Sequence, residues 1–204
     1  MLLQDKQAGG TLYKHLRYLH KSHHKRYGSY ERRGRIKNAV SIEQRPSVVD
    51  SRSRIGDWED DTVIGKNKKR IIYTLVDRKN LYTVIVKLNS KNATELADKT
   101  LKVLEPMSSK IHTITYDNGL EFAEHERMAK ALGTDIYFAH LYSSWERSIN
   151  ENTNRLIRQY LPKGTDFNKI TNSQIEFVMN RLNTRDGKQP VELFLVEAVD
   201  LLTA

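Results

Sequence analysis

The sequence predicts an α/β protein with one mixed sheet of five strands, flanked by helices and preceded by a basic N-terminal arm. Three observations carry this prediction. Three β-rich runs with short polar turns between them follow residue 56, which is typical of an antiparallel meander. Helices and strands then alternate, which favours further strands in the same sheet and helices on both of its faces. The excess positive charge is confined to the first quarter of the chain.

The individual elements can be placed in order along the chain. Residues 92–106 have the periodicity of a helix that ends at Pro106, and residues 121–133 form a second helix that stops at Gly133. Further helices are expected beyond residue 147. The predicted strands cover residues 57–65, 70–77, 81–89, 111–117 and 135–139, and the later helices cover 148–162, 173–183 and 190–202.

Composition restricts the class of protein. With 204 residues, 29% charged and 38% hydrophobic, the chain can bury one good core and has a soluble globular composition. No apolar run reaches the roughly 18–20 residues that span a bilayer, and the first residues lack the pattern of a signal peptide. The absence of cysteine excludes disulfides and thiolate metal sites. We therefore expect a cytoplasmic protein with no membrane segment.

The charge distribution indicates a polyanionic partner. Residues 1–56 contain 13 Lys and Arg against 4 Asp and Glu, whereas residues 57–204 contain 21 of each. The net charge of +9 thus belongs to the first segment, where residues 11–27 predict a basic amphipathic helix and residues 28–56 an extended linker. We expect this segment to contact nucleic acid, although a solvated basic tail is the alternative.

Acidic residues stand at the ends of predicted elements, where functional groups of α/β sheets collect. Asp117 ends a strand and precedes an Asn-Gly turn, and Glu151 lies in a helix. At about 100° per residue, Asn154, Arg155 and Arg158 fall within roughly 60° of Glu151. Carboxylates that converge without a basic partner favour Mg²⁺ or Mn²⁺, and two such ions about 3.5–4 Å apart support phosphodiester chemistry. Scattered surface acids remain the simpler explanation of the spacing alone.

Three sequence motifs make the assignment more specific. The stretches WEDDTVIG, TYDNGLEF and YSSWERSINENTNRLIRQY occur in this order, with 33 residues between Asp117 and Glu151. Together they resemble the catalytic core of DDE transposases, above all the insertion-sequence family typified by IS-thirty, with retroviral integrases as more distant relatives. The resemblance covers nearly the whole chain. The basic residue that this family has seven positions after the glutamate is Arg158.

The resemblance implies a ribonuclease-H-like fold and a mechanism. It implies that Asp61, Asp117 and Glu151 are the catalytic residues and hold two Mg²⁺ ions, with Mn²⁺ as a substitute. Water would cleave double-stranded DNA at the ends of the element, and the freed 3′-OH would attack target DNA. It also implies a homo-oligomer on DNA, associated with the bacterial nucleoid.

The chain also departs from the family pattern. Members of this family usually begin with a helix-turn-helix region, and only three residues precede residue 4 here, so we expect that region to be missing. Leu141 stands where proline is usual, and Ser148 stands where glycine is usual. These departures predict a truncated transposase. The alternatives are an inactive chain that only binds DNA or a partner, and a plain ribonuclease-H-like nuclease. The predicted domains are residues 1–55 as a DNA-contacting arm, 56–185 as the catalytic core and 186–204 as a C-terminal helix.

Several other side chains are candidates for DNA contact. Trp58 is expected in the core rather than on DNA, and for Trp145 the two roles are equally open. Glu121 is expected to serve as a negative charge at a helix start. The candidate DNA-binding residues are Arg158, Arg155, Asn154, Asn118, Arg147, Lys66, Lys68, Lys69, Arg32, Arg33 and Arg35.

The crowded acids of residues 57–66 can be separated by strand alternation. Glu59 and Asp61 share one face of the predicted strand, and Asp60 lies on the other, so Asp60 and Asp61 cannot serve one site. The family resemblance selects Asp61. The sequence assigns no role to Glu59.

Overall fold

The computed structural model describes residues 2–11, 36–66, 70–141 and 143–184 of the chain. Its centre is a five-stranded sheet in the order β3-β2-β1-β4-β5. β1 pairs antiparallel with β2, and β2 with β3, whereas β1, β4 and β5 run parallel to one another. The predicted mixed sheet is thereby confirmed. The strands are β1 (Asp57–Ile64), β2 (Ile71–Asp77), β3 (Thr83–Leu88), β4 (Thr113–Tyr116) and β5 (Asp135–Phe138).

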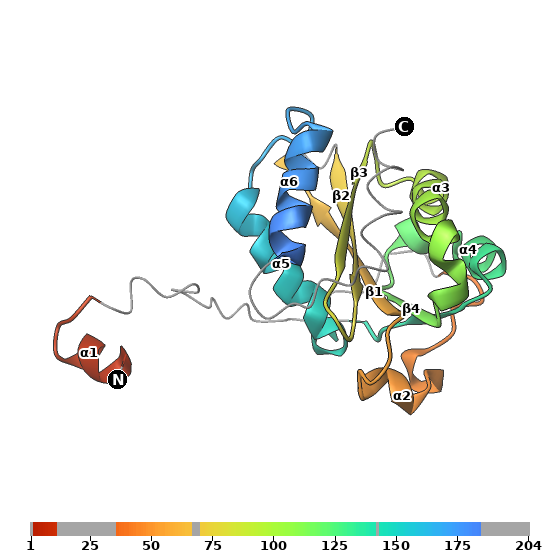
Figure 1. The fold of residues 1–204 in the computed structure, drawn as a ribbon, viewed down its shortest axis with the longest axis horizontal. Coiled ribbons are helices and arrows are strands. Elements are labelled where there is room, and N and C mark those ends of the chain that lie inside the picture. Colours follow the sequence, from red (N-terminus) through yellow and green to blue (C-terminus); the bar gives the residue numbers. More distant parts are fainter. Residues whose placement is uncertain (1, 12–35, 67–69, 142, 185–204) are drawn as a thin grey trace. The chain divides into compact units, whose positions relative to one another are not determined.

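Helices cover both faces of the sheet (Figure 1). The helices α5 and α6 pack on one face, against β1, β2 and β3, and the helices α3 and α4 lie on the other. The α-helices are α1 (Leu2–Gln7), α2 (Ser47–Asp50), α3 (Ala93–Leu104), α4 (His125–Leu132), α5 (Ser148–Tyr160) and α6 (Asn172–Asn183). The 3₁₀ turns are η2 (Ile42–Gln44), η4 (Glu105–Lys110), η5 (Leu120–Phe122) and η6 (Ser144–Arg147).

The helix ends follow the signals in the sequence. The side chain of Asn92 accepts hydrogen bonds from the first-turn amides of α3, as an N-cap residue does. Gly133 ends α4 with a φ of 63°, a left-handed conformation that glycine adopts without a steric penalty. Thr171 and Gln174 form a reciprocal capping box at the start of α6. Local chemistry therefore fixes where these helices begin and end.

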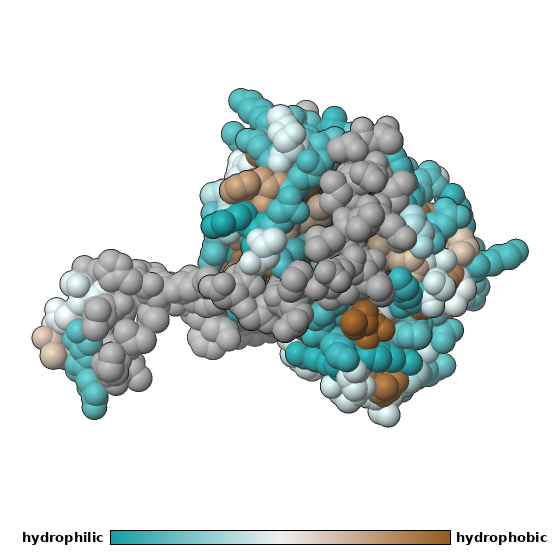
Figure 2. Space-filling model, viewed as in Figure 1, coloured by the Kyte–Doolittle hydropathy of each residue, from teal (hydrophilic) through white to brown (hydrophobic). Residues whose placement is uncertain are grey.

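The core lies on both sides of the three central strands. Every residue of β2 is buried, and Trp58 of β1 is fully buried, which confirms its expected place in the core. Tyr116 and Phe122 stack with ring centroids 4.2 Å apart. The visible face in Figure 2 is mostly hydrophilic, with small separate apolar areas. In the described part of the chain, no helix is both long and apolar enough to cross a membrane.

Residues 36–55, predicted as part of an extended linker, pack against the parallel edge of the sheet. The backbone N–H of Phe138 donates to the Val40 carbonyl at 2.8 Å. Arg45 donates to Thr115 Oγ1 at 3.0 Å, and Val49 is fully buried. The predicted C-terminal helix and most of the predicted basic helix lie outside the described residues, and α1 belongs to a separate N-terminal unit.

Candidate active site

The parallel pairing of β1 with β4 brings two of the predicted catalytic acids together. Glu59 of β1 is in register with Thr115 of β4. Two residues further along each chain stand Asp61 and Asp117. The side chains of neighbouring parallel strands in register point to the same face of the sheet. Both carboxylates therefore lie beside each other toward the carboxyl ends of these two strands.

A single guanidinium group faces both carboxylates. Arg147, in the turn before α5, places Nη1 3.6 Å from Asp61 Oδ1 and Nη2 3.7 Å from Asp117 Oδ2. Its Nη1 also donates to the Asp60 carbonyl at 3.0 Å. Burial raises the pKa of the Asp61 carboxyl; the positive charge of Arg147 opposes that shift, and the charge of Asp117 adds to it. The two carboxylates thus form a pair that is stabilised by a nearby cation.

Both carboxylates are also held in orientation by hydrogen bonds. Asn154, on α5, donates from Nδ2 to Asp61 Oδ2 at 2.8 Å. The backbone N–H of Thr62 donates to Asp61 Oδ1 at 2.8 Å, and that of Gly119 donates to Asp117 Oδ1 at 2.8 Å. Asn154, which the sequence predicts to contact DNA, therefore donates a hydrogen bond to Asp61 in this structure.

Glu151 stands apart from the pair. Its side chain is 46% exposed and forms an ion pair with Arg155, one turn further along α5. Within the described ranges, no three acidic or histidine side chains gather closely enough to hold one metal ion. The structure thus brings Asp61 and Asp117 together and leaves Glu151 on the adjoining helix.

Two further acids of β1, Glu59 and Asp60, are buried on opposite faces, in agreement with strand alternation. Asp60 accepts a hydrogen bond from the Tyr73 hydroxyl, and burial raises the pKa of its carboxyl well above the ordinary value. Glu59 faces α5, where its carboxylate contacts Arg78 and accepts the N–H of Asn150 at 3.1 Å. Sequence reasoning missed these partners of Glu59, because neither is local and no motif links them.

The remaining predicted DNA contacts are distributed unevenly. Arg158 is half-buried and donates to the Ile64 carbonyl at 2.6 Å, and Asn118 donates to the Ala139 carbonyl. Lys66 is exposed. The predicted contacts that lie outside the described residues are Lys68, Lys69, Arg32, Arg33 and Arg35.

Two further sequence expectations concern side chains near this edge. Trp145 is 65% exposed. Glu121 is buried, and it accepts hydrogen bonds from Lys91 at 2.6 Å and from Thr62 Oγ1 at 3.0 Å. Glu121 therefore links η5 to β1 rather than only marking a helix start.

The paired carboxylates fit a hard divalent cation. Both offer oxygen ligands at one solvent-accessible edge, and the guanidinium of Arg147 shows that a positive charge is accommodated between them. The Glu151 carboxylate would have to break its ion pair with Arg155 before it could bind the same ion. The donor chemistry suits Mg²⁺ or Mn²⁺ better than Zn²⁺, which favours nitrogen and sulfur ligands.

The fold is that of integrase catalytic cores. The catalytic core domain of bovine immunodeficiency virus integrase superimposes with a TM-score of 0.54 at 20% identity, over 69% of this chain and 93% of that chain. An intasome of simian T-cell lymphotropic virus in complex with a PP2A regulatory subunit gives a TM-score of 0.55 at 14% identity, over 90% of this chain and 61% of that chain. The order of the strands and these superpositions thus define a ribonuclease-H-like fold.

Sequence comparisons find relatives of this chain among the transposases of insertion elements. Residues 52–144 match the integrase core domain family. The chain is 46% identical over 186 residues to the transposase for insertion sequence element IS4351 of Bacteroides fragilis, and 38% identical over 180 residues to the transposase InsI for element IS30A of Escherichia coli. These alignments cover 91% and 85% of this chain. Over most of its length the chain is therefore similar to DDE transposases of the IS30 type. It spans 57% and 47% of the length of these two relatives.

Proposed function

We propose that this chain is the catalytic domain of a DNA transposase. It cleaves DNA at the ends of an insertion sequence in a metal-dependent reaction and joins the freed 3′-OH to target DNA. The observation that carries this proposal is the convergence of Asp61 and Asp117 on one cationic group, beside the helix that bears Glu151. The relatives of the chain support it, since they are named as transposases of insertion elements.

Asp61, Asp117 and Glu151 would hold two Mg²⁺ ions, with Mn²⁺ as a substitute. When bound, these ions supply Lewis-acid activation of the attacking oxygen and charge stabilisation at the phosphate. Asn154 fixes the orientation of the Asp61 carboxylate. Arg147 and Arg155, each now paired with an acid, become available to phosphate oxygens once the acids bind metal.

The proposal includes partners and location. The substrate is double-stranded DNA, both as element ends and as target, and the chain acts as a homo-oligomer on that DNA. The solved intasome among the structural neighbours supports an assembly of this kind. The N-terminal basic segment adds charge for phosphate contact. A cytoplasmic protein associated with the nucleoid would meet this substrate.

The test is a plasmid assay with two readouts. Supercoiled plasmid is incubated with the protein in Mg²⁺, in Mn²⁺ or with chelator, and nicking is followed together with joining of a labelled oligonucleotide that carries a free 3′-OH. We expect both activities to require the divalent ion. Asp61→Asn, Asp117→Asn and Glu151→Gln should each reduce the rates by about 10³-fold or more, with DNA affinity changed less than about threefold.

Asp60→Asn is the matched control, because it makes the same chemical change one position away, on the opposite face of β1. It should keep the wild-type rates. Cleavage without joining would indicate a plain nuclease. DNA binding without nicking in either ion would indicate a binding module and refute the enzymatic proposal.

A further inference from the structure

The buried acid Glu59 contacts the first turn of α5. It is fully buried, and its Oε2 accepts the backbone N–H of Asn150 at 3.1 Å. Since α5 begins at Ser148, Asn150 is its third residue, and an amide at this position has no carbonyl partner within its own helix. Glu59 supplies that partner from β1.

The start of α5 lacks a cap from its own sequence. Arg147 occupies the N-cap position, and its side chain makes no capping hydrogen bond. A capping side chain normally comes from that position and satisfies the amides of the second or third residue. Here a carboxylate from a neighbouring strand takes its place, with a negative charge at the positive end of the helix dipole.

The negative charge of Glu59 is balanced inside the protein. Arg78, only 4% exposed, contacts the other carboxylate oxygen. Its Nε donates to the Val49 carbonyl at 3.1 Å, and its Nη2 lies 3.5 Å from Asp50. A buried carboxylate with a paired and hydrogen-bonded counterion is held in one position, so the cap it provides is rigid.

A second contact joins the same strand to the same helix. Asp61, two residues after Glu59, bonds Asn154, four residues after Asn150. Two strand residues advance about 6.6–6.8 Å and four helix residues about 6 Å, so the two contacts match in spacing. Glu151 lies between the two contact points on α5.

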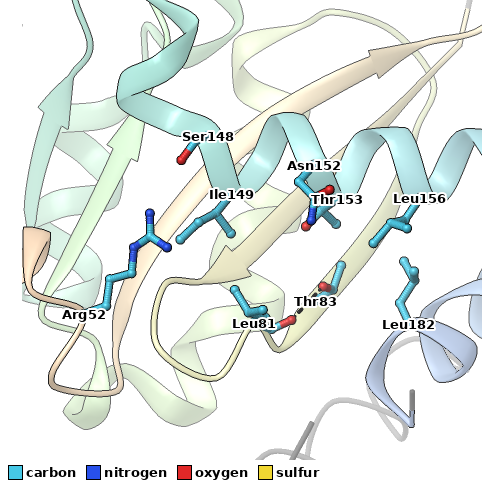
Figure 3. A pocket seen from close by; sticks show the side chains of 9 residues that line it. All are labelled: Arg52, Leu81, Thr83, Ser148, Ile149, Asn152, Thr153, Leu156 and Leu182. Atoms are coloured by element: carbon cyan, nitrogen blue, oxygen red, sulfur yellow. Dashed lines mark hydrogen bonds between the residues drawn. The ribbon is translucent and has the colours of Figure 1, made fainter. Parts of the chain in front are cut away.

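Apolar packing leaves space at one side of the start of α5 (Figure 3). A cavity of about 170 Å³ lies between the first turns of this helix and the β2–β3 hairpin. Ser148 and Ile149 line it from the helix, and Leu81 lines it from the hairpin. Packing on this side therefore does not fully fix the position of the first turn, and the hydrogen bond to Glu59 contributes more to it.

We propose that Glu59 is a positioning residue, which caps α5 from β1 and thereby sets where Glu151 stands relative to Asp61. Its importance for the reaction rests on the proposed function. The cap needs only an acceptor oxygen within reach of the Asn150 amide. The carboxylate charge of Glu59 serves to pair Arg78, so a variant that removes this charge must also replace Arg78.

The test compares two double variants that differ only in the acceptor. Both replace Arg78 by Met, so neither leaves a buried guanidinium unpaired. Glu59→Gln/Arg78→Met keeps an oxygen toward the Asn150 amide, and Glu59→Leu/Arg78→Met removes it. Hydrogen exchange is measured on peptides that cover residues 148–156, with peptides from α6 as the internal reference.

We expect the Leu/Met variant to exchange about tenfold faster than the Gln/Met variant over residues 148–156, with α6 unchanged. The Mn²⁺ concentration that gives half of the thermal shift should rise about tenfold or more. Nicking should slow by a similar factor while DNA affinity changes less than about threefold. Equal exchange and an equal Mn²⁺ midpoint in the two variants would overturn the proposal.

A second variant keeps the test decisive if the Leu/Met protein does not fold. Glu59→Asp preserves the charge but shortens the side chain by one methylene, which we expect to withdraw the carboxylate from the Asn150 amide. It should show the same faster exchange and raised Mn²⁺ midpoint, and wild-type values for both would refute the role of Glu59. If the wild-type chain does not nick DNA, the proposed function fails, while exchange and Mn²⁺ response still decide this inference.

Discussion

Arg147→Gln should tighten the binding of a divalent ion to the DNA-free protein. The guanidinium lies 3.6 Å from Asp61 and 3.7 Å from Asp117, where it neutralises the carboxylates that an ion would need. An incoming ion must displace this charge. Glutamine keeps polarity at the position but removes the competing cation.

The size of the effect follows from the two contacts. At an effective dielectric constant of about 20, each contact would be worth about 4.5 kcal/mol. The Asp61 and Asp117 side chains are 22% and 36% exposed, however, so solvent screens both. Measured pairs with such access contribute up to about 1 kcal/mol each, or about 2 kcal/mol for two. We therefore expect the dissociation constant for Mn²⁺ to fall about 30-fold.

The assay is calorimetric titration of Mn²⁺ into chelator-stripped protein without DNA. Arg127→Gln is the control, since it removes an arginine that pairs with Asp98 between α3 and α4 and should leave the constant unchanged. Unchanged or weaker Mn²⁺ binding in Arg147→Gln would refute the reasoning. It would mean that Arg147 organises the carboxylates for the ion instead of competing with it.

Three further predictions concern stability and DNA binding. Burial raises the pKa of Asp60 beside Tyr73, so the folded protein retains a proton that the unfolded chain releases above pH about 4, and stability falls as pH rises through that window. Asp60→Asn should therefore stabilise the protein by an amount that grows by up to about 1.4 kcal/mol per pH unit in urea unfolding, and a gain independent of pH would contradict this. Gly56→Ala should cost about 3 kcal/mol, because Gly56 has a φ of 100° and a Cβ there would lie 1.9 Å from the Lys110 carbonyl oxygen, whereas Gly133→Ala, at a φ of 63° with open space, should cost only about 1 kcal/mol. Equal losses would show that the contact is not the cause. The last prediction concerns the arginines Arg32, Arg33 and Arg35 of the basic arm. Replacing all three by Gln should reduce the slope of log K for DNA binding against log salt concentration by about 2 to 3, and an unchanged slope would show that they do not contact DNA.

The sequence was sufficient for the features that depend on local pattern. The polar turns after residue 65 and residue 77 predicted the meander, and the alternation of β1 correctly separated Asp60 from Asp61. The position of Asp117 after a strand predicted its place at the sheet edge. These predictions succeeded because strand period and helix caps are properties of neighbouring residues.

The missing features depend on contacts between distant segments. Glu59 meets Arg78 and Asn150 only once β1, β2 and α5 are assembled, so no spacing in the sequence predicts the cap. The bridge from Arg147 to both aspartates is of the same kind. Helical angles placed Asn154 and Glu151 on one exposed face, but the angle alone did not show that the strand lies against Asn154.

The packing of residues 36–55 has a practical consequence for how the domain can be isolated. The Val40 carbonyl occupies a hydrogen-bonding position on the outer strand β5, and Val49 contributes a fully buried side chain. A fragment that begins at residue 56, where the charge balance changes, would expose the backbone N–H of Phe138 on the edge strand β5. Exposed backbone groups of an edge strand can pair with a strand of another molecule and so promote aggregation. A soluble minimal core for crystallisation should therefore retain residue 36 onward, and its aggregation behaviour should change abruptly when the start is moved past Val40.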